Sequence, residues 1–315
     1  MLTVIGEALV DLVPEGRSGR YRESPGGSPF NVAVGLARLG NRTSLMARFA
    51  DDRFGRLLRG AAVQEGIDLS AAPRAAERAT VATASVDPAG QVTYEFDLDG
   101  TADWAWSAAE LRAVSPATQV LHFGSIAAWT PPGAERIAAL AGALGVAGTV
   151  LISYDPNIRP SVIGSREHAA RIVEQNIRLA HVVKASREDL AWLYPELQTH
   201  QVAAHWTRLG PALVVVTDGA DGASAYRRVS PPLRRPGRRV DVVDTIGAGD
   251  AFTAGLLTGL VRRRLHRNGR IGSTSEGTLA DIVDEAILVS AITCERAGAD
   301  PPRLAELSPA LRAGA

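Results

Sequence analysis

The segment from residue 240 to residue 261 restricts the fold of this chain more than any other. It begins with a predicted hydrophobic strand at Val240–Val243, continues through the turn Asp-Thr-Ile-Gly-Ala-Gly-Asp at residues 244–250, and ends in an apolar stretch, Ala251–Val261, that predicts a helix. The first backbone N–H groups of a helix have no partner within it and carry the positive end of its dipole. Because glycine and alanine stand at the start of this helix, a phosphate group can reach those amides. We therefore predict a strand, a turn and a helix that bind an anion.

The carboxylate of Asp250 stands at the end of this turn and would repel a bound anion. Its expected role is to take a proton from a hydroxyl group that attacks the phosphorus atom. A Walker loop is excluded because it needs a lysine after its last glycine, and Lys184 is the only lysine in the chain. A dinucleotide-binding fingerprint is excluded because Phe252 stands in place of its third glycine. The alternative, an ordinary glycine-rich connection, does not account for the aspartates at both ends of the turn.

The composition is typical of a globular protein with a large core, since 46% of the 315 residues are hydrophobic and 22% are charged. The 34 basic and 34 acidic side chains balance, so bulk electrostatics favour neither nucleic acid nor an anionic membrane. The N-terminus lacks the pattern of a signal peptide, and no apolar run reaches the length of a membrane span. We therefore expect a cytoplasmic protein. The single cysteine, Cys294, excludes an internal disulfide and is expected to be a buried structural thiol.

Short apolar stretches alternate with amphipathic or alanine-rich ones along most of the chain. The expected strands are Leu2–Ile5, Thr43–Phe49, Val120–Phe123, Thr149–Ser153, His181–Val183 and Leu213–Thr217. The expected helices lie near Arg53–Glu65, Pro132–Leu144, Arg166–Ala180 and Arg187–Tyr194. A further helix begins at Ser28, with Pro29 at its first position and Gly40 after its end. This alternation predicts an α/β fold with a mostly parallel sheet covered by helices on both faces.

Two segments interrupt the alternation. Residues 12–27 are polar and rich in turn-forming residues. Residues 80–97 predict a hairpin, with strands Thr80–Val86 and Gln91–Asp97 joined by the turn at residues 87–90. Together they are expected to form a small β flap over the open edge of the sheet.

Polar residues follow the predicted strands at the points where each strand ends. In open parallel sheets, ligands bind beyond the carboxyl ends of the strands. The residues in such positions are Asp11, Asn31, Asp155–Arg159, Ser186, Asp189, Thr217–Gly222 and Asp244–Asp250. Each one alone also fits a turn or a helix cap, but together they predict one ligand-binding edge. His122 is expected to be a strand-end histidine with satisfied polar atoms rather than a pocket residue.

Four motifs resemble those of a known family. The segments GGSPFNVAVGLARLG (residues 26–40) and DTIGAGDAF (residues 244–252) resemble the signatures of the ribokinase-like sugar kinases, also called the phosphofructokinase-B type. The segments GEALVD (residues 6–11) and DPNIR (residues 155–159) are most similar to the fructokinase branch. The resemblance covers nearly the whole chain.

This resemblance implies a single ribokinase-like kinase domain over residues 1–315. The implied fold has three layers, with a mostly parallel central sheet flanked by helices. A small β lid is expected from segments near residues 12–27 and 80–104.

The resemblance also implies the catalytic groups. Asp250 corresponds to the general base that acts on the sugar hydroxyl group. The amides of Gly247, Ala248 and Gly249 correspond to an anion hole for the charge that develops on the phosphoryl group. Arg159 corresponds to an arginine near the transferred phosphate and the substrate, where its planar guanidinium suits phosphate oxygens.

The implied sugar-binding residues come from the N-terminal motifs and the lid. Asp11, Gly27 and Asn31 correspond to groups that hold sugar hydroxyls. Tyr94 and Phe96 alternate on one face of a predicted lid strand and are candidates to close over the sugar. The alternative for these two aromatic residues is a small hydrophobic cluster within the lid.

The implied nucleotide site includes Thr217, Gly219 and Gly222. Asp218 departs from the family pattern and adds a carboxylate to this loop, which puts the loop's phosphate contacts in question. Ser186 is expected to contribute to the same site as the first residue of the motif described next.

The implied metal sites rest on two further motifs. The family's Asn-x-x-Glu motif, which organises Mg²⁺ through water and phosphate, appears here as Ser-Arg-Glu-Asp at residues 186–189. Asp189 is expected to serve Mg²⁺ through water, with Glu188 as the alternative. Asp244 and the carbonyl group of Ile246 match part of a monovalent-cation site found in several members.

These correspondences imply an ATP-dependent kinase that transfers the γ-phosphoryl group to a primary hydroxyl group of a small sugar, with fructose as the first candidate. The alternative substrates are 2-keto-3-deoxygluconate and ribose. A sugar acid would need an additional cation in the sugar pocket, and none is evident besides Arg159. A non-catalytic sugar or nucleotide sensor would not need Asp250. A dehydrogenase is disfavoured because no glycine-rich fingerprint follows the first strand.

The expected partners follow from this activity. The implied cofactors are ATP and Mg²⁺, with K⁺ as the candidate monovalent cation, and the sugar is the other ligand. Neither nucleic acid nor a membrane is an expected partner. The assembly is left open between a monomer and a homodimer that forms through the lid.

Overall fold

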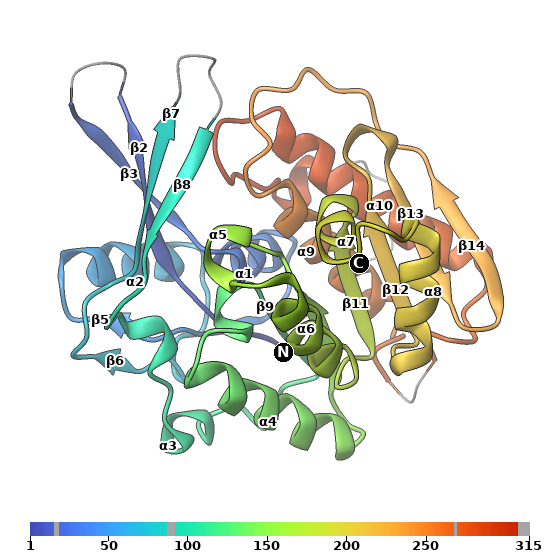
Figure 1. Cartoon of the computed structure of the whole chain (residues 1–315), viewed down its shortest axis with the longest axis horizontal. Helices are drawn as coiled ribbons and strands as arrows, with labels where there is room; N and C mark the ends of the chain where they lie inside the picture. The colour runs from blue at the N-terminus through green and yellow to red at the C-terminus, as the bar shows by residue number, and fades with distance from the viewer. Residues whose placement is uncertain (16–18, 87–91, 268–269, 308–315) are drawn as a thin grey trace.

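A central β-sheet organises the structure. The computed structural model describes residues 1–15, 19–86, 92–267 and 270–307. Within these residues the central sheet has eight strands in the order β14-β13-β12-β11-β10-β9-β1-β4 (Figure 1). Neighbouring strands from β12 to β4 are parallel, and β13 and β14 add antiparallel strands at one edge. The strands are β1 (Leu2–Ile5), β4 (Thr43–Met46), β9 (Val120–Gly124), β10 (Leu151–Asp155), β11 (Val182–Ser186), β12 (Leu213–Thr217), β13 (Ala223–Arg227) and β14 (Ser230–Arg235).

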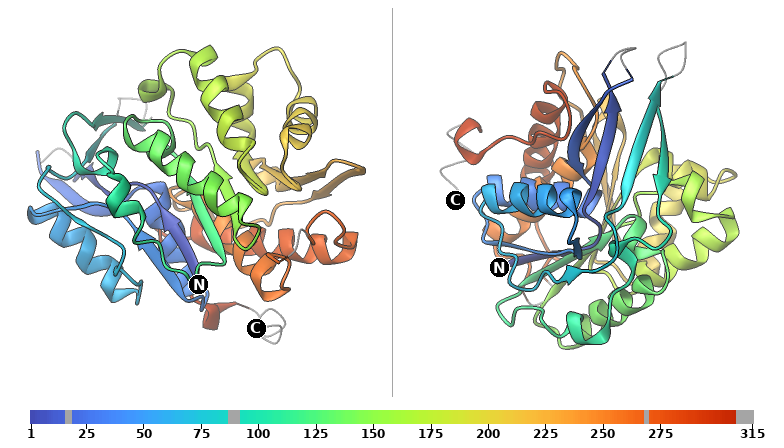
Figure 2. Two further views of the ribbon diagram at one scale, coloured as in Figure 1. Left: turned by 90° about the horizontal axis from the view of Figure 1, so that it is seen from below. Right: turned by 90° about the vertical axis from the view of Figure 1, so that its left-hand side faces the viewer.

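Helices cover both faces of this sheet, which confirms the expected three-layer α/β fold (Figure 2). One face carries α1 (Ser28–Arg38), α2 (Arg53–Gln64), α9 (Ala248–Arg262) and α10 (Glu276–Cys294). The other face carries α3 (Ala108–Leu111), α4 (Gly133–Val146), α6 (Arg166–Ile177), α7 (Arg187–Leu193) and α8 (Thr199–Leu209). Helix α9 packs against both α1 and α10 and is buried along most of its length, which explains why it is apolar on all sides.

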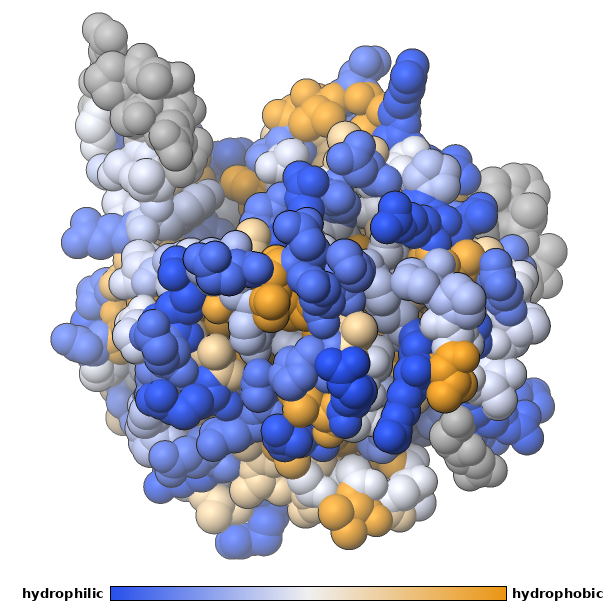
Figure 3. All heavy atoms as spheres, turned by 45° about the vertical axis from the view of Figure 1, so that its right-hand side comes forward, coloured by the Kyte–Doolittle hydropathy of each residue, from blue (hydrophilic) through white to orange (hydrophobic). Residues whose placement is uncertain are grey.

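Apolar side chains are concentrated in the two cores that flank the sheet. The face drawn in Figure 3 is correspondingly mostly hydrophilic, with small and separate apolar patches. Among the described residues, no helix is both long and apolar enough to span a bilayer.

A second, smaller sheet projects from one end of the central sheet and forms the lid (Figure 2). Its strand order is β3-β2-β7-β8, with β2 and β7 parallel in the middle. The strands are β2 (Leu9–Pro14), β3 (Tyr21–Gly26), β7 (Val81–Val86) and β8 (Val92–Asp97). The predicted hairpin is confirmed by the antiparallel pairing of β7 with β8, although its turn lies outside the described residues. The lid thus combines two segments that are far apart in the sequence.

Two strand predictions need correction. Val240–Val243 is not a strand, because it crosses from the edge strand β14 to the start of α9 and has no neighbouring strand to pair with. Its attachment is instead the amide of Val243, which donates to the carbonyl of Cys294 at 2.8 Å. The predicted strand Thr43–Phe49 is divided into β4 and the short β5 (Phe49–Ala50), and β5 pairs with β6 (Arg74–Ala75) in a separate sheet.

Candidate active site

Two cavities meet at the carboxyl ends of the parallel strands within the described part of the chain. The lid cavity has a volume of about 270 Å³ and lies between the lid and the start of α9. The outer cavity has a volume of about 810 Å³ and lies between α7, the turn after β12 and helix α10. The residues that line both are Asn157, Arg159, Lys184, Thr245 and Gly249. A group bound in one cavity can therefore reach a group bound in the other.

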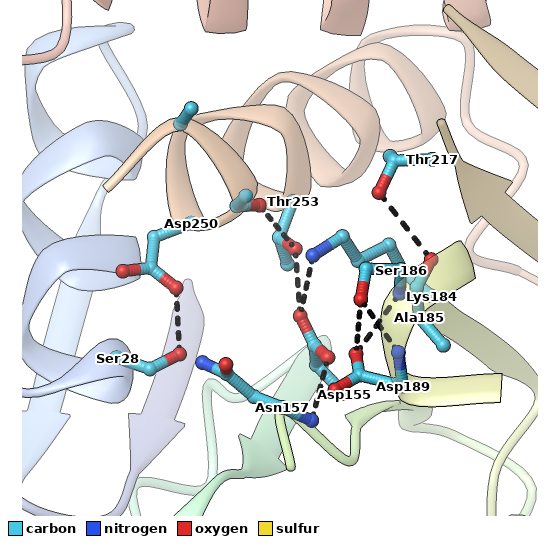
Figure 4. A network of polar contacts seen from close by, with 12 residues as sticks. Ser28, Asp155, Asn157, Lys184, Ala185, Ser186, Asp189, Thr217, Asp250 and Thr253 are labelled. Carbon is cyan, nitrogen blue, oxygen red and sulfur yellow. Dashed lines mark hydrogen bonds and ion pairs between the residues drawn. The ribbon is translucent and has the colours of Figure 1, made fainter. Parts of the chain in front are cut away.

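Asp250 lines the lid cavity from the first turn of α9. Ser28 Oγ donates to its Oδ1 at 2.6 Å (Figure 4). Asn31 Nδ2 donates to its Oδ2 at 2.9 Å, so α1 holds the carboxylate from two sides. Burial raises the pKa of Asp250, although these two hydrogen bonds and nearby Lys184 act in the opposite direction. A carboxylate with a raised pKa and a fixed orientation is suited to accept a proton from a hydroxyl group.

The turn before α9 depends on its glycines. Gly247 has a φ of 75°, and a Cβ atom there would lie 2.5 Å from the Cβ of Ala299. Of the three predicted anion-hole amides, that of Ala248 donates to the carbonyl of Thr245 at 3.2 Å. Among the described residues, the amides of Gly247 and Gly249 have no hydrogen-bond acceptor in the protein. Gly249 lines both cavities and Gly247 lines the lid cavity beside it, so these two amides are open to an anion where the cavities meet.

Lys184, in the middle of β11, places a positive charge at this junction. Its Nζ donates to Asp155 Oδ2 at 2.9 Å, and both side chains are buried (Figure 4). Burial acts to lower the pKa of Lys184, but the ion pair with Asp155 holds that pKa above its usual value. A Cβ atom at position 249 would lie 2.9 Å from Nζ, so the glycine allows the ammonium group to approach the turn. Sequence reasoning considered this lysine only as a test for a Walker loop and missed its place in the site.

Arg159 lines both cavities, as predicted for a residue close to the substrate and the phosphate. Asn157 precedes it with a φ of 40°, in the left-handed region that asparagine tolerates better than most residues. The amide of Asn157 donates to Asp155 Oδ1 at 3.1 Å, and the Arg159 guanidinium donates to the side-chain oxygen of Asn157. This tight turn directs the guanidinium to the junction.

The lid contributes Asp11 from β2 and the aromatic rings of Tyr94 and Phe96 from β8, and all three line the lid cavity. Burial raises the pKa of Asp11 to about 6, while Arg159 acts to lower it. A Cβ atom at position 26 would lie 2.1 Å from Asp11 Oδ2, so a larger residue there would displace this carboxylate.

The body of the protein also contributes residues to the lid cavity. Gly27 and Asn31 line it as predicted, and so does Glu7, which sequence reasoning did not single out. Glu7 is buried and accepts from the amide of Ala127 at 3.0 Å. His122 lines neither cavity and is bonded to Ser153 at 3.0 Å, as expected for a satisfied strand-end histidine.

The outer cavity contains the residues predicted for the nucleotide. Thr217, Gly219, Gly222 and Ser186 all line it. Sequence reasoning missed a set of mostly apolar lining residues, which comprises Val240, Val242, Phe252, Ile287, Ala291 and Cys294. Cys294 is half-buried rather than part of the core. Arg238 and Arg239 also lie at this cavity. An apolar slot with small neighbours suits a planar aromatic base.

Two acidic residues of α7 differ in their surroundings. Asp189 is buried, and its Oδ1 accepts from the amide of Ile158 at 2.9 Å. Its Oδ2 accepts from both the amide and the hydroxyl group of Ser186, at 3.0 and 2.8 Å (Figure 4). Glu188 is exposed and lines the outer cavity. The described residues contain no cluster of three or more His, Cys, Asp or Glu side chains that could hold a metal, so a divalent ion here would depend on phosphate and water.

The carboxylate of Asp218 does not line the outer cavity. It forms an ion pair with Arg187, whose Nε lies 2.8 Å from Oδ1. The additional negative charge that the sequence places in this loop is therefore balanced by a residue of α7.

The carboxylate of Asp244 supports the turn before α9 from below. Its Oδ1 accepts from the amide of Ile246 at 3.0 Å, and its Oδ2 accepts from the amide of Gly298 at 2.8 Å. These bonds join the turn to the segment that follows α10.

Comparison with known proteins shows the family and the fold. The family model described as pfkB family carbohydrate kinase matches residues 1–305. A fructokinase from Rhizobium leguminosarum bv. trifolii is 36% identical, over 89% of this chain and 85% of the relative. A crystal structure of a fructokinase double mutant from Vibrio cholerae O395, in fructose, ADP and potassium ion bound form, has a TM-score of 0.81 at 29% identity and covers 95% of this chain and 94% of that one. The structure of a fructokinase with bound ATP from Xylella fastidiosa has a TM-score of 0.87 at 25% identity and covers 97% of this chain and 96% of that one.

Proposed function

Because the chain belongs to the pfkB family of carbohydrate kinases, we propose that it transfers the γ-phosphoryl group of ATP to a primary hydroxyl group of fructose. The observation that carries this proposal is the junction of the two cavities. The base Asp250 lies in the lid cavity, and the open amides and Lys184 lie where that cavity meets the outer one. Acceptor and donor can thus be held on opposite sides of the transferred group.

The proposed mechanism assigns each chemical task to a residue. The sugar lies in the lid cavity, where Asp11 and Asn31 bind its hydroxyl groups. Asp250 takes the proton of the attacking sugar hydroxyl group. At the same time the oxygen of that hydroxyl group bonds to the γ-phosphorus, and the bond between the γ-phosphorus and the leaving ADP breaks. The amides of Gly247 and Gly249, with Lys184 and Arg159, stabilise the charge on the phosphoryl oxygens.

Metal ions complete the proposal. Mg²⁺ at the outer cavity would be held through water by Glu188, because the oxygens of Asp189 already accept from Ile158 and Ser186, and it would neutralise charge on the phosphates. A monovalent cation, K⁺, would be held by the carboxylate of Asp244 and the carbonyl of Ile246. The hydrogen bonds of Asp244 to the turn and to the segment after α10 support this site, because a cation there would stiffen the anion-binding loop.

The charges around the lid cavity support a neutral sugar over a sugar acid. Its described lining includes the carboxyl groups of Glu7, Asp11 and Asp250. The cations Lys184 and Arg159 already bond to Asp155 and Asn157. The carboxylate of a sugar acid would therefore be repelled by these acidic side chains, whereas the hydroxyl groups of a neutral sugar can donate to them.

The test is ADP release measured with fructose, ribose and 2-keto-3-deoxygluconate, and without a sugar. We expect sugar-dependent release with the highest kcat/KM for fructose, because polar groups placed for its hydroxyls are left unpaired by other sugars. A higher value for either alternative would overturn the fructose assignment while leaving a kinase. ADP release that does not depend on any sugar would overturn the kinase itself.

A further inference from the structure

The carboxylate of Asp103 links the N-terminal ends of the two central lid strands, β2 and β7. Asp103 lies on the 3₁₀ helix η1 (Ala102–Trp104), directly after the lid, and is only 1% exposed. Its Oδ1 accepts from the amide of Ala8 at 3.0 Å, and its Oδ2 accepts from the hydroxyl group of Thr80. Ala8 directly precedes β2 and Thr80 directly precedes β7, so one side chain holds the first residues of two parallel neighbours.

The same cluster attaches the lid to the body of the protein. The hydroxyl oxygens of Thr80 and Thr101 lie 2.7 Å apart, and Thr101 Oγ1 donates to the carbonyl of Leu98 at the end of the lid. On the body side, the buried guanidinium of Arg48 donates to the carbonyl of Ala102 at 2.7 Å. Asp103 is therefore anchored next to the body of the protein and bonds to the first residues of the lid.

The lid residues of the proposed sugar site are positioned by the N-terminal ends of β2 and β7. Asp11 is three residues beyond Ala8 on β2, and Tyr94 and Phe96 lie on β8, which pairs along β7. Asp103 itself lines neither cavity. We propose that Asp103 is a positioning residue that sets the angle of the lid over the bound sugar and so keeps water from the transferred phosphoryl group. This inference rests on the proposed kinase function.

The chemistry of the site supports a specific role. Burial raises the pKa of Asp103 to about 7, and nearby Glu7 adds to this effect, while Thr80, the amide of Ala8 and Arg48 act to lower it. Burial of a charged group is costly, and loss of this side chain would leave the buried amide of Ala8 without its acceptor. What the carboxylate adds is a pair of acceptors in fixed directions, one for each strand.

The first test compares Asp103→Ala with Asp103→Asn in the full-length enzyme. We expect Asp103→Ala to lower kcat/KM for fructose by roughly 10- to 100-fold, the scale of a misplaced substrate group, mainly through KM. The KM for ATP should stay unchanged, and more ADP than sugar phosphate should form because water reaches the phosphoryl group. Asp103→Asn should recover much of the loss, because its oxygen still accepts from Ala8 while its amide donates to Thr80. Lower thermal stability with unchanged KM and one ADP per sugar phosphate would overturn the proposal.

A second pair of variants applies if Asp103→Ala does not fold. Thr80→Ser keeps the hydroxyl group and should match the wild type. Thr80→Val removes the hydroxyl group that donates to Asp103. This variant should raise the KM for fructose and the excess of ADP over sugar phosphate. Equal values for these two variants would overturn the proposal.

Hydrogen exchange gives a readout that needs no substrate. Amides of β2 and β7 should exchange faster in Asp103→Ala or Thr80→Val than in the wild type, while those of β10 and β11 should not change. Unaltered exchange in the lid overturns the role of Asp103 even if the enzyme is an active kinase. If these variants exchange faster but the protein shows no sugar-dependent ADP release, the role of Asp103 in holding the lid is supported and only the proposed function is overturned.

Discussion

The Nζ atom of Lys184 lies 2.9 Å from Oδ2 of Asp155, and this buried pair stands directly below the first turn of α9. We expect Lys184→Met to lower kcat by about 10²–10³, as for other transition-state donors. It should also reduce the free energy of unfolding by about 3–5 kcal/mol, because Asp155 is left buried and unpaired. The double variant Lys184→Met/Asp155→Asn should recover stability without activity. Recovery of both in a steady-state assay would mean that the pair only supports the fold.

Asp250→Asn should fold normally, because an asparagine can still accept from Ser28. Its kcat should fall by about 10²–10⁴, typical for the loss of a general base, with the KM for ATP little changed. The matched control is Asp281→Asn, an exposed position on α10. Near wild-type turnover of Asp250→Asn would remove the base from the mechanism.

The ion pair of Arg187 and Asp218 compensates for the carboxylate in the nucleotide loop. Arg187→Ala should raise the KM for ATP by at most about fivefold, since exposed pairs contribute about 0.2–1 kcal/mol. Asp218→Asn should have little effect alone and should reverse the loss in the double variant. Additive effects across this double-mutant cycle would show that the two side chains act independently.

The raised pKa of Asp11 gives a pH signature. The side chain accepts strong, charge-assisted hydrogen bonds from sugar hydroxyls through both oxygens only when it is ionised, so kcat/KM for fructose should fall as the pH drops through about 6. The raised pKa of Asp250 adds to this acid limb. A pH profile that is flat from 5 to 8 would contradict both assignments.

The same shift has the opposite sign for stability. The folded-state pKa of Asp11, about 6, is above its ordinary value of 3.8, so ionisation destabilises the fold. The stability associated with the protonated group is complete below pH 3.8 and is lost as the pH rises through about 6. Asp11→Asn should therefore raise Tm relative to the wild type at pH 8 but not at pH 3.5, while activity falls. An equal Tm difference at both values would refute this linkage.

The sequence predicts Asp189 as the residue that serves Mg²⁺, but its oxygens already accept from Ile158 and Ser186. We expect Glu188→Ala to raise the Mg²⁺ concentration for half-maximal rate, because Glu188 is exposed at the outer cavity. Asp189→Ala should instead lower kcat and stability. Glu196→Ala is the control. A shift in the Mg²⁺ requirement for Asp189→Ala alone would support the sequence-based assignment.

Local patterns in the sequence were sufficient for much of the fold. The parallel strands are continuous apolar runs because they are buried on both faces, and α1 has a proline and a glycine at the expected ends. The turn before α9 was recognisable because its glycines are needed by the backbone itself. These features depend on residues that are close together in the chain.

Features that depend on distant partners were missed. Val240–Val243 looks like a strand, but whether it pairs depends on which neighbour the sheet provides. Lys184 gains its role from Asp155, 29 residues earlier, and Asp103 from Ala8, 95 residues earlier. The only local signal for Lys184 was a charged residue in an apolar run, and Asp103 had none.

The thiol of Cys294 lies at the outer cavity, and the chain has no other cysteine. The unaltered enzyme thus has a single attachment point for a fluorescent or spin label, placed where a nucleotide base is proposed to bind. Burial raises the pKa of this thiol, so labelling is slow at neutral pH. Labelling would select molecules whose proposed nucleotide site is vacant. The rate at which a thiol reagent attaches would then report how often the nucleotide slot is vacant.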